Sequence, residues 1–186
     1  MAKTKQSDLI YQLKITLKNI QPPVWRRVQV KDCTLARLDD IIQTCMGWDG
    51  GHLSAFEVGG EQYSVPYPDG MMEGHDARKA KLSQLVAQGI KKFTYTYDFG
   101  DNWDHTIEIE KTLPAESGAR YPRCIEGKRA CPPEDCGGPW GYGDFLTAIQ
   151  NPKHPEHEEM LEWVGGEFDP EAFDLELVNE GLRGGG

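Results

Sequence analysis

The sequence has no long apolar run and no complete set of catalytic motif residues. No stretch approaches the roughly 18 apolar residues that cross a bilayer, so we expect no membrane span. Residues 1–11 carry lysines but no apolar segment, so we expect no secretory signal there. The 186 residues also lack a Walker A sequence, a Gly-x-Ser-x-Gly elbow and a His-Glu-x-x-His motif. Because these motifs are absent, no enzyme class is indicated by a sequence motif.

Positive charge is scarce, because 30 Asp and Glu residues face 20 Lys and Arg residues and give a formal charge of −10. A net negative surface repels a phosphate backbone, so we expect no bulk electrostatic binding of nucleic acid. The charge is uneven: residues 1–31 hold seven basic groups and one acid, whereas residues 144–186 hold two and 11. The basic N-terminal arm is thus the part suited to a phosphate backbone or an acidic partner. A solvated strand edge, where lysines block aggregation, is the competing and favoured interpretation of this arm.

Cysteines are few and odd in number. Five cysteines without an expected signal peptide predict reduced thiols in the cytoplasm rather than a disulfide framework. Cys124, Cys131 and Cys136 cluster, with six and four residues between them, but structural zinc takes four ligands, usually in closely spaced pairs. The fourth ligand would come from His52, His105, His154 or His157. The cluster therefore predicts either a site for zinc or another divalent cation, or a proline-fixed loop of reduced thiols.

Period-two alternation of apolar residues predicts strands in the first 112 residues. Leu9–Leu17 alternates cleanly, and a second strand over Val24–Val30 follows Pro22-Pro23, which fit a turn or a sheet edge. Two short strands, His52–Val58 and Gln62–Val65, are joined through a Gly-Gly pair. A loop rich in proline, glycine and aspartate then extends from Pro66 to Arg78.

Helical signals dominate the remainder of the chain. Thr34 is the expected N-cap of a helix that ends at Gly47, and a short helix is expected over Leu82–Ala87. After an irregular stretch over 114–141, three helices are expected at Tyr142–Gln150, Pro155–Val164 and Pro170–Glu180, with Asp169 as the last N-cap.

This order of elements predicts an α+β fold. We expect a mostly antiparallel sheet of about five to six strands in the N-terminal two thirds. An N-terminal helix and a C-terminal group of about three helices should pack with it. Residues 1–183 should form a single domain, followed by a disordered glycine tail at 184–186.

The clearest hairpin joins two aromatic-rich strands, 93–99 and 103–109. A three-residue loop would pair Phe99 with Trp103 and Tyr97 with His105, which keeps both apolar faces together. The same register sets Asp98 opposite a second aspartate, Asp104. Because opposed like charges cost stability, Asp98 requires a partner such as an arginine, a backbone N–H or a divalent cation.

Asp98, Asp101, Asp104 and His105 are accordingly the weak candidates for catalysis at the hairpin tip. Three carboxylates could hold a metal for hydrolysis or phosphoryl transfer. Ordinary turn chemistry explains the aspartates as well, and His105 lies on the apolar face, where a core histidine is the competing interpretation.

Several stretches together resemble a known family, the plasmid pRiA4b orf-three-like family, over about Leu9 to Leu182. The resemblance is carried by Pro22-Pro23-Val24-Trp25-Arg26-Arg27, by Gly47-Trp48 through His52-Leu53 to Phe56, by Tyr97-Asp98-Phe99-Gly100-Asp101 with Trp103 and His105, and by Cys131-Pro132-Pro133-Glu134-Asp135-Cys136-Gly137-Gly138 with Gly141-Tyr142. Some members are encoded on plasmids or insertion elements and are labelled resolvase-like. A serine resolvase needs a nucleophilic serine supported by arginines, and Ser7 in an acidic chain does not match that requirement. The resemblance implies no catalytic residues, since none are established for the family.

Three functions remain as hypotheses. The first is a cytoplasmic, non-catalytic binding or adaptor domain, with a protein or small-molecule partner at the 98–105 hairpin tip and the 124–141 loop. The second is a metal-dependent hydrolase or nuclease built on Asp98, Asp101 and Asp104, with Glu134 and Asp135 contributed by the loop. The third is an accessory DNA-binding protein of mobile elements that acts through the basic arm.

Overall fold

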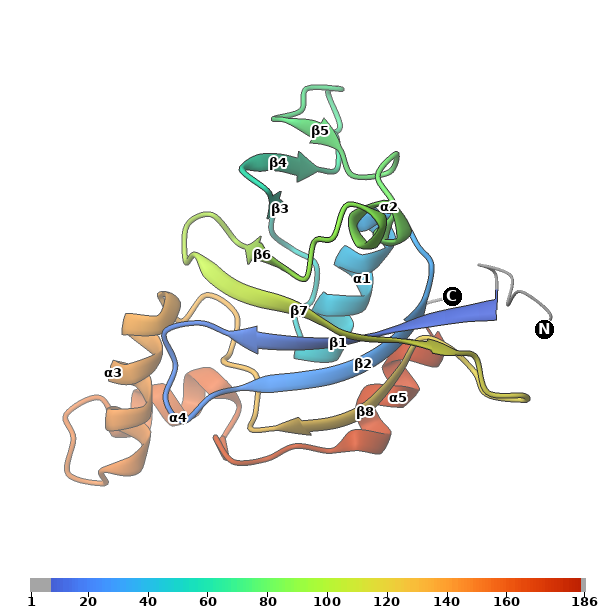
Figure 1. Cartoon of the computed structure of the whole chain (residues 1–186). Coiled ribbons are helices and arrows are strands. Elements are labelled where there is room, and N and C mark those ends of the chain that lie inside the picture. The colour runs from blue at the N-terminus through green and yellow to red at the C-terminus, as the bar shows by residue number, and fades with distance from the viewer. Residues whose placement is uncertain (1–7, 185–186) are drawn as a thin grey trace.

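One eight-stranded sheet and five helices make up the computed structural model over residues 8–184 (Figure 1). The strands are β1 (Leu9–Leu17), β2 (Trp25–Lys31), β3 (Ser54–Val58), β4 (Glu61–Ser64), β5 (His75–Asp76), β6 (Lys92–Tyr97), β7 (Trp103–Pro114) and β8 (Arg123–Lys128). The helices are α1 (Leu35–Met46), α2 (Leu82–Ala87), α3 (Gly138–Gln150), α4 (His157–Val164) and α5 (Leu175–Gly184). No helix in this range combines the length and apolar composition needed to cross a membrane.

Residues 1–7 and 185–186 lie outside the described part of the chain. Ser7 and the first two lysines of the predicted basic arm therefore fall outside it, as do two residues of the predicted glycine tail. The third residue of that tail, Gly184, is the last residue of α5.

The α+β class is confirmed, but the sheet is larger than the five to six strands expected. Its strand order is β5-β4-β3-β6-β7-β1-β2-β8. All neighbouring strands are antiparallel except β4 and β5, so the sheet is mixed. The two additional strands are the outermost ones, β5 and β8. Because β8 pairs with β2, the second strand is not the sheet edge that its prolines suggested; those prolines lie in the turn between β1 and β2.

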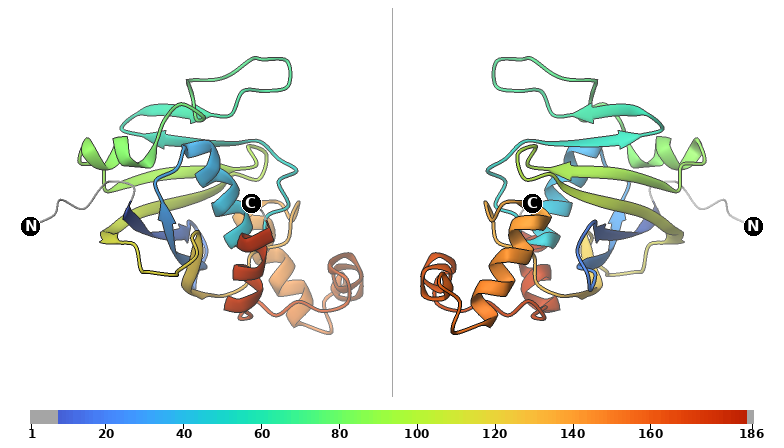
Figure 2. Two further views of the ribbon diagram at one scale, coloured as in Figure 1. Left: turned by 90° about the vertical axis from the view of Figure 1, so that its right-hand side faces the viewer. Right: turned by 90° about the vertical axis from the view of Figure 1, so that its left-hand side faces the viewer.

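The core lies between the sheet and α1. Alternate residues of β1, such as Leu13 and Ile15, are fully buried, which agrees with their period-two pattern. The predicted start of α1 is confirmed, because the Thr34 side chain accepts a hydrogen bond from the Arg37 N–H. The helix ends at Gly47, whose φ of 109° favours glycine. Figure 2 shows α1, α3 and α5 on the same side of the sheet.

The β6–β7 hairpin forms in a register two residues away from the expected one. Tyr97 pairs with Trp103 and Tyr95 with His105, so the turn spans the five residues 98–102. A shift of two residues leaves every side chain on its predicted face, because the strand period is two. It does change the neighbours: Asp104 faces Thr96, and the expected opposition of Asp98 and Asp104 is wrong.

The C-terminal helix begins later than its start signals predicted. Asp169 accepts a hydrogen bond from the Glu171 N–H, but this closes only a turn. The residue that caps α5 is Asp174, whose Oδ1 accepts from the N–H groups of Glu176 and Leu177 at 3.0 Å each. Two aspartates thus carry similar local signals, and packing of α5 against α1 and β8 decides between them.

Candidate metal centre

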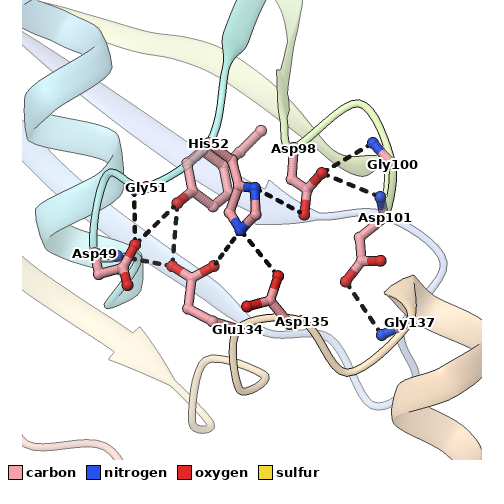
Figure 3. Close-up of polar contacts among 10 residues, drawn as sticks. Asp49, Gly51, His52, Asp98, Gly100, Asp101, Glu134, Asp135 and Gly137 are labelled. Atoms are coloured by element: carbon pink, nitrogen blue, oxygen red, sulfur yellow. Dashed lines mark hydrogen bonds and ion pairs between the residues drawn. The ribbon is translucent and has the colours of Figure 1, made fainter.

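His52 lies between two carboxylates that come from distant parts of the sequence (Figure 3). Its Nδ1 is 3.6 Å from Asp98 Oδ2, and its Nε2 is 3.0 Å from Asp135 Oδ1. One ligand atom from each of the three residues fits within 4.8 Å. Within residues 8–184 this is the only group of three or more His, Cys, Asp and Glu residues with such spacing. Imidazole nitrogen with carboxylate oxygen is a donor set that suits zinc and manganese.

The turn after β6 positions Asp98. Its backbone adopts the left-handed conformation, with φ of 58°, which aspartate tolerates better than most residues. Asp98 Oδ1 accepts hydrogen bonds from the N–H groups of Gly100 at 2.9 Å and Asp101 at 3.3 Å. The Asp98 N–H donates to the Leu53 carbonyl at 2.8 Å, which ties the turn to the residue after His52. These bonds leave Asp98 Oδ2 free to face the imidazole.

Glu134 lies beside His52, and only one of its two carboxylate oxygens accepts hydrogen bonds. Its Oε1 accepts hydrogen bonds from the Asp49 N–H at 2.8 Å and the Tyr97 hydroxyl at 3.1 Å. Its Oε2 is buried, has no hydrogen-bond partner within the described chain and lies 3.8 Å from His52 Nε2. Burial raises the pKa of Glu134, and burial raises the pKa of Tyr97 as well. An orphaned carboxylate oxygen of this kind costs free energy unless a cation or a proton compensates it.

The site opens to solvent through Asp135. The Asp98 side chain is 11% exposed and that of His52 is 32% exposed, whereas Asp135 is 69% exposed. A tetrahedral ion with bonds of about 2.1 Å sets its ligand atoms about 3.4 Å apart. Ligand atoms that lie up to 4.8 Å apart must therefore approach by as much as about 1.4 Å to reach that value.

The structure does not bring the predicted aspartate trio together. Asp101 Oδ2 accepts a hydrogen bond from the Gly137 N–H at 3.1 Å, just before α3. Asp104 Oδ1 accepts from the Thr96 hydroxyl at 2.6 Å, because strand alternation puts Asp104 on the face opposite His105. Only Asp98 of the three lies at the site, and its partners are His52 and the two backbone N–H groups rather than Asp104.

The three clustered cysteines do not form a ligand group in the described part of the chain. Cys124 is buried on β8, where the side chain of Asn179 bonds both its N–H and its carbonyl. Cys131 and Cys136 flank the turn that carries Glu134 and Asp135. Burial raises the pKa of all three thiols, that of Cys136 to about 12, so they are protonated at neutral pH.

Of the histidines proposed as a fourth ligand, only His52 lies near carboxylates of the site. His105 is fully buried, with Nδ1 3.3 Å from the Tyr95 carbonyl and Nε2 3.4 Å from Trp48 Nε1. It is a core histidine without access to solvent. His157 Nδ1 lies 2.9 Å from the Ala148 carbonyl, and His154 Nδ1 accepts a hydrogen bond from the Glu156 N–H. Both histidines therefore make contacts with the backbone near α4.

The sequence patterns indicate the same two loops but not that His52 is the centre of the candidate site. From the sequence, His52 is predicted only as a fourth ligand beside the cysteines. Glu134 and Asp135 are predicted only as additional carboxylates beside the aspartate trio. The one indication of His52 in the sequence is that Asp98 needs a positively charged or hydrogen-bonding partner. Because His52 lies 46 positions away from Asp98, no local sequence pattern identifies it as that partner.

Known proteins similar to this chain match it over nearly its whole length. A protein of Sinorhizobium fredii described as uncharacterized protein y4hQ is 40% identical over 179 residues, which cover 93% of this chain and 90% of that protein. A crystal structure of a protein of unknown function, MM3350 from Methanosarcina mazei Go1, shows 40% identity and a TM-score of 0.83, covering 90% of this chain and 96% of that one. The family model of the plasmid pRiA4b ORF-3-like protein matches residues 9–177. The chain therefore belongs to the plasmid pRiA4b ORF-3-like family.

Proposed function

We propose that this chain is a binding protein that takes a divalent cation, zinc or manganese, between the β6–β7 turn and the loop before α3. The observation that carries the proposal is the convergence of His52, Asp98 and Asp135 within 4.8 Å. The buried Oε2 of Glu134 beside them, which has no hydrogen-bond partner within residues 8–184, adds support. A cation held there would complete a surface for a protein or small-molecule partner, formed by loops on a rigid sheet.

The local charge balance favours a bound divalent ion, rather than the His52 imidazole alone, as the group that compensates the nearby carboxylates. Three carboxylates, those of Asp98, Glu134 and Asp135, lie within 4 Å of the His52 ring. A protonated imidazole supplies one positive charge against as many as three negative charges. Burial of Asp98 and Glu134 makes such an excess costly, and a divalent cation compensates it more fully.

We expect metal-free protein to bind one equivalent of Zn²⁺ or Mn²⁺ in isothermal titration calorimetry, and His52→Ala to weaken this binding at least tenfold. Removal of the imidazole leaves only carboxylate ligands, one of them highly exposed. His75→Ala is the matched control, because His75 forms a similar pair with Glu61 at 3.0 Å on the exposed β4–β5 edge.

A double variant, Cys131→Ser with Cys136→Ser, tests the competing cysteine site. We expect its affinity to equal that of the unsubstituted chain. Binding that survives His52→Ala and disappears in the cysteine variant would contradict the proposal and move the site to the thiols.

Metal-dependent hydrolysis is the second candidate, and the position of Glu134 favours it. Its Oε2, which accepts no hydrogen bond within residues 8–184, lies 3.8 Å from His52 Nε2. If an ion were held there, it would supply Lewis-acid activation of water, and the Glu134 carboxylate would be placed to act as the general base. We expect Glu134→Gln to retain Mn²⁺ binding while losing at least tenfold in the hydrolysis of bis(p-nitrophenyl) phosphate. A Mn²⁺-loaded chain with no turnover above the free-ion background would leave binding as the function.

The five cysteines support a location in a reducing compartment such as the cytoplasm, because all five are free thiols. One basic group of the arm proposed for DNA binding, Arg27, is already paired with Glu110 at 2.8 Å, which makes it less available to a phosphate backbone. A gel-shift assay at low salt, where phosphate contacts are strongest, would reveal such binding if it exists.

A further inference from the structure

A pocket of about 430 Å³ opens between α3 and α4, beside Asp135. Its apolar wall consists of Phe145, Met160 and Trp163. The rings of Phe145 and Trp163 meet edge to face, with centroids 5.6 Å apart. Phe145 is buried, but 46% of Trp163 remains exposed, so an aromatic surface faces the pocket. We call this cavity the α3–α4 pocket. Its volume lies in the range of small-molecule sites.

The charged groups that line the α3–α4 pocket are all acidic. Asp135, Asp144 and Glu156 lie along it, and no Lys, Arg or His of the described chain does. Asp135 is paired with His52, but within residues 8–184 no ion pair neutralises Asp144 or Glu156. The surrounding sequence offers little compensation, because residues 144–186 hold only two basic residues against 11 acids. The pocket therefore combines an aromatic wall with an uncompensated negative rim.

We infer that the α3–α4 pocket binds an organic cation, an ammonium or guanidinium group on an apolar stem. The stem packs on Phe145 and Met160, where its burial removes apolar surface from water. The cationic head lies between Asp144 and Glu156 and against the face of Trp163, which attracts it through the ring quadrupole. The same carboxylates repel an anion, and a neutral ligand would not compensate their negative charge.

This ligand class has two sources, a free amine and an arginine or lysine side chain of a protein. The pocket is open to solvent, so both can reach it. Agmatine represents the free amine, and acetyl-Gly-Arg-Gly-amide represents the side chain in a peptide. The matching peptide with citrulline in place of arginine has nearly the same shape without the charge.

Titrations followed by the indole N–H signals in ¹H–¹⁵N NMR spectra test the inference. We expect agmatine or the arginine peptide to shift the Trp163 signal, assigned through Trp163→Phe, and the citrulline peptide to bind at least fivefold more weakly. If only agmatine binds, the source is a free amine; if the arginine peptide binds at least as well, it is a protein side chain. Equal binding of the citrulline peptide, or no shift by either cation, overturns the inference.

Charge-neutralising variants give the second readout. We expect the double variant Asp144→Asn, Glu156→Gln to weaken binding at least fivefold, because it removes two of the three rim charges. The matched control is Glu158→Gln, Glu159→Gln, two exposed acids of α4 that do not line the pocket. Equal losses in both variants would show a non-specific charge effect and contradict the inference. All titrations contain EDTA, so failure of the divalent-cation site does not affect them.

Discussion

Gly141→Ala is expected to destabilise the protein by about 3 kcal/mol, the upper end of the usual cost of overpacking, and to weaken divalent-cation binding. A Cβ added to Gly141 would lie 2.0 Å from the Cys136 carbonyl oxygen and 2.9 Å from its carbon. Both atoms belong to backbone, so no flexible side chain can move aside. The loop that carries Glu134 and Asp135 must shift instead, and α3 must part from it.

Gly143→Ala is the matched control, two residues further along the same helix. A Cβ at Gly143 meets nothing within 4 Å. Alanine in a helix interior is favoured over glycine by about 1 kcal/mol, so this variant should be neutral or more stable. Urea unfolding and calorimetric titration with Zn²⁺ or Mn²⁺ measure the two effects. Equal stability and equal affinity in the two variants would show that the close approach of α3 to Cys136 does not hold the site.

The folded chain is expected to lose about 3 kcal/mol of stability between pH 7 and pH 4 because of His105 alone. Burial lowers the pKa of His105 from 6.5 to about 4. Between these values the unfolded chain takes up a proton that the folded chain does not. The contribution is therefore complete above pH 6.5 and falls away as the pH drops towards 4.

The hydrogen bonds of His105 explain why the folded chain keeps it neutral. The Trp48 Nε1–H donates to Nε2, so the imidazole proton must be on Nδ1, which points at the Tyr95 carbonyl. Both nitrogens are satisfied in this tautomer. A second proton on Nε2 would face the indole N–H, which is itself a donor and cannot accept it.

His105→Gln provides the comparison, because an amide can accept from Trp48 and donate to Tyr95 without titrating. Urea unfolding at pH 7 and pH 4 for both proteins gives the difference. We expect the variant to lose clearly less stability over this range than the unsubstituted chain. An identical pH dependence would contradict the assignment, and the acid sensitivity would then belong to the carboxylates.

Elements with a strong local pattern were predictable from the sequence. The strand over Leu9–Leu17, the α1 cap at Thr34 and the helix over Leu82–Ala87 all match the structure. Each is set by period-two or period-3.6 burial together with a turn residue, and these signals lie within a few positions of each other.

Features that depend on distant pairing were not predictable. The strand β8 is short and alternates poorly, and it exists because its backbone pairs with β2. The register of the β6–β7 hairpin differs by two residues from the expected one, and hydrophobic pattern cannot distinguish such registers because they expose the same faces. The deciding factor is the turn, where Asp98 and Asn102 both adopt positive φ values.

The candidate site was predictable as a place but not as a set of ligands. The sequence indicated that the hairpin tip and the cysteine loop would meet, and Gly137 donating to Asp101 does join them. It indicated neither that His52 would be brought in by the α1–β3 connection nor that Glu134 would turn inward to Tyr97. Those outcomes depend on where three loops converge, and no local rule describes that.

Such a convergence has a consequence for how the chain opens. His52 and Asp98 are 46 positions apart, and Asp98 and Asp135 are 37 apart. An ion bound to all three would act as a removable cross-link that closes two large loops, as a disulfide does in a secreted domain. The cell's supply of free metal would then set how often the segment before α3 detaches, and with it the segment's exposure to proteases. In any compartment that reduces disulfides, a metal cross-link is a form of reinforcement that remains available.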